Sequence, residues 1–480
     1  MRARDSAQRD LGRRPLVGDA WWCGVVAVLG ACAGPGPARR DAPVPSPETT
    51  HAEARPASPL ATAGAPESPK ASPSAPGHGR TAEVSAEASE PLFRPAQPGA
   101  RAYAANPSQA CAAKRKACVV VPKDRLRAGI LKDVSALAKR ERRPPPQADA
   151  RLDAAMNDLA HNLRGDDLPA LEVVDFLLTH YGIAEPSPHL LLSRATAGAD
   201  REVREQAGKE IATVYKSDPV TRVGIGIDRT GGLMYVVVGL QESHLALEPV
   251  PRHLARGASA PIGGKLEGRY RAARVVVTSP DGKVAEQPPS SRAGQVEGTL
   301  ACLGDGKYQV EVTAEDKSGT AVLANFPVYC GVEPPAIAPR GAGTRQVKVS
   351  AEAAERELLA LVNRDRAAAG LGAVTWDARL ATIARAHSRD MAEHDFVGHV
   401  SPRSGTALDR VHKGGLAPEL VLENVGRAYS AQEVESGFMA SPGHRANVVE
   451  PRATKLGVGV VLGAPVTGTI PLYVTPILTN

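Results

Sequence analysis

The chain has no long hydrophobic run, few aromatic residues and little excess charge. The apolar stretch WWCGVVAVLGA at residues 21–31 is too short to span a bilayer comfortably, because a transmembrane helix needs about 20 apolar residues. The aromatic content of 4% reflects the general abundance of Ala, Pro, Arg and Gly in the chain and is not a functional signal. The net charge is +6, and without a clustered basic patch this charge does not indicate a nucleic-acid partner.

Two common catalytic signatures are also missing. The sequence contains neither HExxH, which places two zinc ligands and a base on one helix face, nor GxSxG, which exposes a nucleophilic serine. The sequence alone therefore does not identify an enzyme, and a hydrolase is the class to expect if there is one.

The N-terminus has the pattern of an export signal. Arginines dominate the first 14 residues, the apolar stretch 21–31 follows, and Leu29-Gly30-Ala31-Cys32 resembles a bacterial lipobox. We expect residues 1–32 to be a lipoprotein-type signal peptide and Cys32 to carry the lipid. The protein would then lie outside the cytoplasm, anchored to a membrane. The alternatives are an ordinary secretory signal, which would release the protein, and an apolar start without export.

Four cysteines remain after Cys32. An even number suits disulfides in an oxidising compartment. Cys302 and Cys330 fall near two predicted strands, and Cys111 and Cys118 bracket a short AAKRKA segment, so we expect these two pairings.

Composition and patterning divide the rest of the chain into five parts. Residues 33–110 are rich in Pro, Ala, Ser and Gly and cannot bury enough apolar surface to fold, which predicts a disordered tether. Alternating strands separated by turns predict an Ig-like β-sandwich over residues 246–336. The remaining parts are an α/β unit at 111–245, a linker at 337–348 and an α+β domain at 349–480.

The last domain begins with clear helix signals. A helix follows Ser350, and a second helix, WDARLATIARAHSRDMA, places His387 on its apolar face. In FMASPGHRANVV, Ser441 is a good N-cap and Pro442 suits the first helical position. His444 then lies in the first turn, where the helix dipole disfavours protonation of its ring. Alone, this pattern fits a surface histidine as well as a functional one.

The motifs of this domain occur in a recognisable order, namely LLALVNRDRAAAGL, DARLATIARAHSRDMA, FVGHVSP, LENV, FMASPGHRANVV and TKLGVGVVL. Residues 350–480 thereby resemble the CAP superfamily (cysteine-rich secretory, antigen 5 and pathogenesis-related 1 proteins) in its bacterial SCP-like form. The resemblance implies a three-layer α-β-α sandwich with a central cleft. The chain as a whole is then an α+β multidomain protein.

The resemblance also implies which residues line the cleft. The first family histidine corresponds to His399, the first glutamate to Glu423 and the second histidine to His444. The second glutamate of animal members falls near Ser441, which is not acidic, and His387 is a further candidate whose helical position favours a buried structural role.

The chain also resembles itself. DARLDAAMNDLAHNL, TRVGIGI and LMYVVVGL in the first half match DARLATIARAHSRDM, TKLGVGV and PLYVTPIL in the second half, in the same order. We infer that 111–245 is a shortened, degenerate copy of the same fold. Leu191 and Ile211 stand roughly where the second copy has Glu423 and His444, so the polar groups are not needed for folding and are functional.

Three functions remain open. His399, His444 and Glu423 suit a divalent metal, Zn²⁺ above all. The first hypothesis is a surface-anchored protein whose cleft binds a metal, or a lipid or cell-envelope ligand. The resemblance supports a lipid, because members of the family are known for lipid binding. The second hypothesis is a metal-dependent hydrolase of peptide or envelope substrates, and the third is a structural or adhesive protein.

Overall fold

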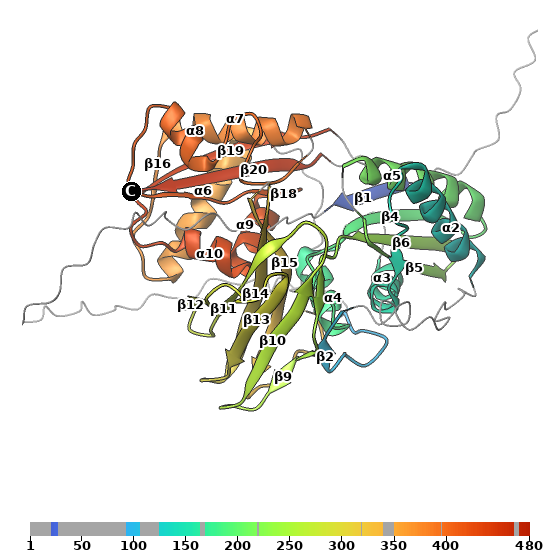
Figure 1. Ribbon diagram of the computed structural model, residues 1–480. Helices are drawn as coiled ribbons and strands as arrows, with labels where there is room; N and C mark the ends of the chain where they lie inside the picture. The colour runs from blue at the N-terminus through green and yellow to red at the C-terminus, as the bar shows by residue number, and fades with distance from the viewer. Residues whose placement is uncertain are drawn as a thin grey trace, which may run out of the picture. The chain divides into compact units, whose positions relative to one another are not determined.

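The computed structural model describes residues 93–105, 124–163, 169–217, 220–317, 319–338, 350–394, 396–464 and 470–480, with backbone alone at 21–26 and 216–217 (Figure 1). Among these residues, no helix is both long enough and apolar enough to cross a membrane.

The first folded part is a five-stranded sheet with helices on both faces. Its strand order is β1-β4-β6-β5-β3. One core lies between α3, α4 and the sheet, and the other between α2, α5 and the sheet. The elements are α2 (Arg125–Arg140), β3 (Gln147–Ala148), α3 (Ala150–Asn162), α4 (Leu171–His180), β4 (His189–Thr196), α5 (Asp200–Ser217), β5 (Arg222–Thr230) and β6 (Leu233–Gln241), with β1 (Trp21–Val26) pairing with β4.

The second part consists of two sheets that share one core. Three strands pair in the order β13-β10-β7 and five in the order β12-β11-β14-β15-β9. Cys302 and Cys330 lie in the shared core and form a disulfide, the pairing expected from the sequence. The strands are β7 (Leu245–Leu247), β8 (Val250–Pro251), β9 (His253–Leu254), β10 (Ser259–Leu266), β11 (Arg271–Thr278), β12 (Val284–Glu286), β13 (Gln295–Ala301), β14 (Gly306–Asp316) and β15 (Gly319–Cys330). The Ig-like class of this part stays a prediction.

The third part is again a mixed sheet with helices. Its order is β16-β19-β20-β17, with β18 also paired to β20. The elements are α6 (Ala351–Ala368), β16 (Thr375–Trp376), α7 (Ala378–His394), α8 (Ala407–Lys413), β17 (Val421–Glu423), β18 (Gly426–Ala428), α9 (Ala431–Ala440), α10 (Pro442–Val448), β19 (Lys455–Leu462) and β20 (Leu472–Thr479). The mixed α/β class expected from the sequence is therefore found, and the three-layer arrangement stays a prediction.

The first and third sheets share their topology. In each sheet a short strand pairs parallel to a long one, which pairs antiparallel to the next: β3 with β5 and β6, and β16 with β19 and β20. The fourth strand pairs antiparallel with the third in both sheets, β4 with β6 and β17 with β20. This agreement supports the inferred internal repeat.

Close packing explains the glycines of the two matching G-x-G motifs. A Cβ on Gly226 of β5 would lie 1.9 Å from the Met156 carbonyl oxygen of α3. A Cβ on Gly459 of β19 would lie 2.1 Å from the Arg385 amide nitrogen of α7. Each helix backbone therefore packs directly on a strand, and only glycine leaves room for it.

The tether boundary predicted at residue 110 lies too far along the chain. Within the expected disordered segment, β2 (Ala102–Tyr103) pairs with β8, and Tyr103 is fully buried. The Tyr103 hydroxyl donates a 2.7 Å hydrogen bond to the Pro327 carbonyl, and Phe93 packs against the core of the first part. Two isolated aromatic residues thus order a stretch whose average composition predicts disorder.

Several predictions fall outside the described residues or are untested by them. Cys32, Cys111 and Cys118 lie outside the described residues, as does most of the 33–110 segment. Trp21–Val26 forms strand β1 in the uncleaved chain, which does not test the predicted signal cleavage.

Candidate functional site

The centre of the candidate site is a buried ionic network. Glu423, at the end of β17, accepts a 2.6 Å hydrogen bond from Arg410 at Oε2, and its Oε1 lies 2.9 Å from Nδ1 of His399. All three residues are almost completely buried. Arg410 comes from α8 and also donates to the carbonyl oxygens of His399 and Gly405. The arginine therefore fixes both the carboxylate and the loop that carries the histidine.

The carboxylate of Glu423 is held in its ionised form. Burial alone raises the pKa of Glu423, but the positive charge of Arg410 and the hydrogen bond with His399 outweigh it and lower the pKa to about 2. An ionised carboxylate at Nδ1 favours the ring tautomer with hydrogen on that nitrogen. The carboxylate thus orients the imidazole of His399.

His387 is buried beside this network. Its Nε2 lies 2.9 Å from the carbonyl oxygen of Gly398, and its ring makes an edge contact with Phe396. Burial lowers the pKa of His387, while the charge of Glu423 acts in the opposite direction. The buried position agrees with the helical spacing that placed His387 on the apolar face of α7.

His444 lies in the first turn of α10, as expected. Ser441 is the N-cap, its Oγ accepting from the His444 amide at 3.5 Å, and Pro442 opens the helix. The His444 ring lies 5.1 Å from that of Phe438, centroid to centroid. Its carbonyl oxygen accepts from Asn424, the residue after Glu423. A hydrogen bond from the Asn424 side chain to the His444 backbone therefore joins the α10 segment to the loop after β17.

Ser441 has a second partner that the sequence does not reveal. Its hydroxyl donates a 2.5 Å hydrogen bond to Glu311 of β14, and the Gly443 amide also donates to that carboxylate. Burial raises the pKa of Glu311 to about 7. An acidic residue from the second part thus contacts Ser441 and the first turn of α10.

The described residues do not assemble a metal site of the expected kind. No group of three His, Cys, Asp or Glu side chains suited to a metal ion is found among them. Both carboxylate oxygens of Glu423 are hydrogen-bonded, one of them to a cation. In this arrangement Glu423 orients His399 instead of serving as a ligand. Zinc binding by His399, His444 and Glu423 therefore stays a prediction.

Sequence reasoning missed Arg410 and Glu311. Arg410 lies on a short helix among other polar residues, so its sequence context resembles a solvated helix face. Glu311 alternates with apolar residues on a strand, and no local signal shows that its position meets α10. The one general clue is that a glutamate buried in its ionised form requires a cation, but this does not identify Arg410 as that cation.

Residues 359–475 match the model of the cysteine-rich secretory protein family, CAP. Two curated relatives from Bacillus subtilis (strain 168) are similar to the same part of the chain. The "uncharacterized protein YkwD" is 33% identical over 128 residues, 26% of this chain and 50% of the relative. The "uncharacterized membrane protein YlbC" is 32% identical over 125 residues, 26% of this chain and 36% of the relative. The chain thus spans half or less of the length of these relatives.

Solved structures with an SCP domain or a cysteine-rich secretory description also match, at low similarity. An extracellular protein containing an SCP domain from Bacillus anthracis str. Ames is 16% identical, with a TM-score of 0.27 over 66% of this chain and 98% of that one. A cysteine-rich secretory protein from Staphylococcus aureus is 14% identical, with a TM-score of 0.23 over 56% and 92%. Together with the similarity to the two curated relatives, the family match shows that the C-terminal domain of the chain is a CAP domain.

Proposed function

We propose that the protein works outside the cytoplasm, anchored by a lipid on Cys32, and that its CAP domain binds an apolar, lipid-like ligand beside His399, Glu423 and His444. The observation that carries the proposal is the buried Glu423–Arg410 pair, which holds His399 in one orientation. Removing two charges from water is costly, and a well-packed apolar pair is often at least as stable. We therefore infer that the pair is retained for its effect on His399.

The surroundings of the histidines favour an apolar ligand. Phe396 lies against His387 and Phe438 against His444, and Met391, Val425 and Tyr473 form a buried apolar cluster packed against Phe396 and Val397. The charges of Glu423 and Arg410 cancel, so the site has little net attraction for an ionic group. Imidazoles among aromatic rings suit a long apolar molecule with a small polar end.

Titration with a dansyl-labelled fatty acid tests the proposal. We expect saturable binding by the purified protein and at least about tenfold weaker binding by His399→Ala. His412→Ala is the matched control, since His412 is an exposed histidine of the same domain, and it should bind like the unchanged protein. Equal binding by all three proteins, or none by any, contradicts the proposal.

A hydrolase is the second candidate, and the 2.9 Å contact between His399 and Glu423 favours it, since a carboxylate-oriented imidazole is a general base. Glu423→Ala separates the two functions. Casein cleavage by the unchanged protein that disappears in Glu423→Ala would support the hydrolase, whereas the lipid-binding proposal predicts no cleavage of fluorescent casein by either protein. Of the serines near the site, Ser441 caps α10 and donates to Glu311, and Ser401 donates to Asp390, so neither is arranged as a nucleophile.

The predicted zinc site and lipid anchor each have a direct test. Calorimetry with zinc on the purified protein, His399→Ala and His444→Ala tests the metal; binding that survives both changes removes the zinc hypothesis. Cys32→Ser should move the protein from the membrane fraction to the soluble fraction of the cells that produce it. Retention of this variant in membranes contradicts lipid anchoring at Cys32.

A further inference from the structure

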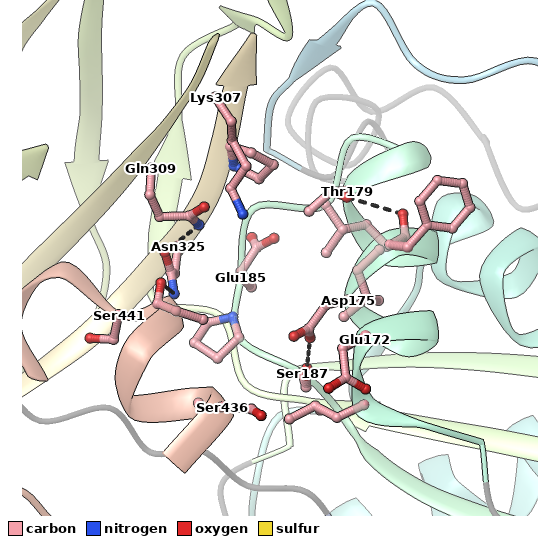
Figure 2. A pocket seen from close by; sticks show the side chains of 18 of the residues that line it. Glu172, Asp175, Thr179, Glu185, Ser187, Lys307, Gln309, Asn325, Ser436 and Ser441 are labelled. Carbon is pink, nitrogen blue, oxygen red and sulfur yellow. Dashed lines mark hydrogen bonds between the residues drawn. The ribbon is translucent and has the colours of Figure 1, made fainter. Parts of the chain in front are cut away.

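A cavity of about 470 Å³ lies among α4, the β14–β15 pair and α9 (Figure 2). This volume is in the usual range for small-molecule sites. The lining residues of the CAP domain come from α9 and include Ser441; the histidines of the candidate cleft are not among them. The cavity is therefore a second site, separate from the one proposed above.

Much of the cavity wall is apolar. Phe176 and Leu171 of α4 and Ile183 after it contribute one side, and Val322 and Tyr329 of β15 contribute another. An apolar wall favours a ligand with an apolar body, since burying it removes hydrocarbon surface from water.

The polar groups of the wall have opposite charges on opposite sides. Asp175 and Glu172 project from α4, and Lys307 projects from β14 with its amine directed into the cavity (Figure 2). Asp175 accepts a 2.5 Å hydrogen bond from Ser187, and burial raises its pKa to about 6. Burial lowers the pKa of Lys307, whereas the charge of Asp175 acts to raise it. Within the described ranges, Lys307 makes no ion pair.

Glu185 adds a further acidic group to the α4 side. It is 5% exposed, and its Oε1 lies 2.6 Å from Arg222 and accepts from Ser243. Its Oε2 has no hydrogen-bond partner in the part of the chain that the structure describes. A buried carboxylate oxygen without a donor is costly, and the ammonium group of a ligand would supply one.

One residue joins the walls of the cavity. The backbone N–H of Asn325 donates to the Ala184 carbonyl at 2.7 Å, and its side-chain Nδ2 donates to the Ala440 carbonyl at 3.1 Å. Gln309 donates to Asn325 Oδ1 at 2.7 Å. Because these bonds join the loop after α4, the β14–β15 pair and α9, the cavity is formed before any ligand arrives, which lowers the entropic cost of binding.

We propose that this cavity binds an apolar amino acid or dipeptide in its zwitterionic form, with the ammonium on the Asp175 side and the carboxylate on Lys307. A purely cationic ligand would leave Lys307 without a counter-charge, and a purely anionic ligand would leave Asp175 and Glu172 without one. A zwitterion with an apolar body satisfies both sides and the wall between them. The inference goes beyond the proposed function of the CAP cleft and does not depend on it.

Calorimetric titration of the purified protein with the dipeptide Leu-Leu tests this site. We expect saturable binding, with at least about tenfold loss for N-acetyl-Leu-Leu, which has no ammonium, and for Leu-Leu-amide, which has no carboxylate. Gly-Gly should bind more weakly than Leu-Leu, because it has no apolar side chains.

Two variants and a matched control test which side chain binds each charged end of the dipeptide. Asp175→Asn keeps an acceptor for Ser187 and should weaken Leu-Leu to the level of N-acetyl-Leu-Leu, while leaving the binding of N-acetyl-Leu-Leu itself unchanged. Lys307→Met should weaken Leu-Leu to the level of Leu-Leu-amide. Lys265→Met, on an exposed position of β10, should leave binding unchanged. Thermal melting identifies any variant that fails to fold. The absence of Leu-Leu binding at millimolar concentration, or binding insensitive to both blocked ends, overturns the proposal.

Discussion

At the residue scale, the structure concentrates its unusual chemistry in buried carboxylates. Glu423 is kept ionised by Arg410, whereas Glu311 and Glu435 are buried without a nearby cation of that kind and have raised pKa values of about 7 and 8. The pKa of the same side-chain type is thus shifted in opposite directions within one molecule, because burial favours the neutral form and a guanidinium favours the charged one.

Glu423→Gln should destabilise the CAP domain by about 3–5 kcal/mol, because it leaves Arg410 buried without its counter-charge. Urea unfolding followed by Trp376 fluorescence measures the change; the other two tryptophans, Trp21 and Trp22, lie in the predicted signal peptide and are absent after cleavage. The double variant Glu423→Gln with Arg410→Met should recover part of the loss, and His412→Ala should stay within about 0.5 kcal/mol. A cost below about 1 kcal/mol for Glu423→Gln would mean that the pair is not tightly buried.

The raised pKa of Glu435 predicts that the free energy of unfolding falls as pH rises. Burial and the neighbouring Asp365 raise the pKa of Glu435 to about 8, above its unfolded value, so the folded state binds the proton more tightly. The stabilisation that comes from this tighter proton binding by Glu435 is fully present below about pH 4.5 and is lost as pH rises through about 8. Glu435→Gln mimics the protonated side chain and should stabilise the protein at pH 8 by roughly 1–3 kcal/mol.

Urea midpoints between pH 5 and 8.5 measure this dependence. The matched control is Glu357→Gln, an exposed glutamate on α6, whose midpoint should follow that of the unchanged protein. If Glu435→Gln shows the same slope with pH as the unchanged protein, the carboxyl is not protonated in the folded state.

The sequence predicts only part of this residue-level picture. Through the family resemblance it indicates His399, Glu423 and His444, and helical spacing explains the burial of His387. Arg410 and Glu311 could not be predicted, because each meets the site through the packing of separate elements and neither has a distinctive neighbour in the chain.

At the element scale, the two sheets depend on close contact between a helix backbone and a strand. Gly459→Ala should destabilise the protein strongly, by about 3 kcal/mol or more, because the new Cβ meets the Arg385 and Ala384 backbone at 2.1–2.2 Å. Gly208→Ala is the contrasting change. No atom lies within 4 Å of its added Cβ, so in helix α5 it should stabilise by about 0.5–1 kcal/mol. Thermal melting compares the two, and similar small shifts would mean that α7 does not pack directly on β19.

Elements were more predictable than their boundaries. The repeated DARL and G-x-G motifs place equivalent helices and strands in both halves, and in both copies the aspartate before the helix accepts from the amide two residues on. Strand β2 was missed because its two residues lie within a Pro- and Ala-rich segment and gain their order from contacts with β8 and Pro327.

At the scale of the whole molecule, the β-rich second part depends on a covalent link. Cys302 and Cys330 are separated by 28 positions, and closing such a loop in the unfolded chain is worth about 3–4 kcal/mol. Replacing both cysteines by alanine should lower stability by about this amount. Urea unfolding under oxidising and reducing conditions measures it, and the unchanged protein under reduction should match the double variant. If the oxidised and the reduced protein have the same free energy of unfolding, the disulfide does not stabilise this part.

The general organisation of the chain follows from its sequence, whereas the contacts between its parts do not. Motif order identifies the CAP domain, and alternation predicts strands after residue 246. The hydrogen bonds of Asn325 and Glu311 to the segment around Ser441 join residues more than 100 positions apart, and no local pattern indicates them.

The most direct test of the central claim is the dansyl fatty-acid titration of the purified protein beside His399→Ala and His412→Ala. The proposed function predicts saturable binding by the unchanged protein and by His412→Ala, with at least about tenfold weaker binding by His399→Ala. Binding that is equal in all three, or absent in all three, would contradict a lipid-binding site organised around His399.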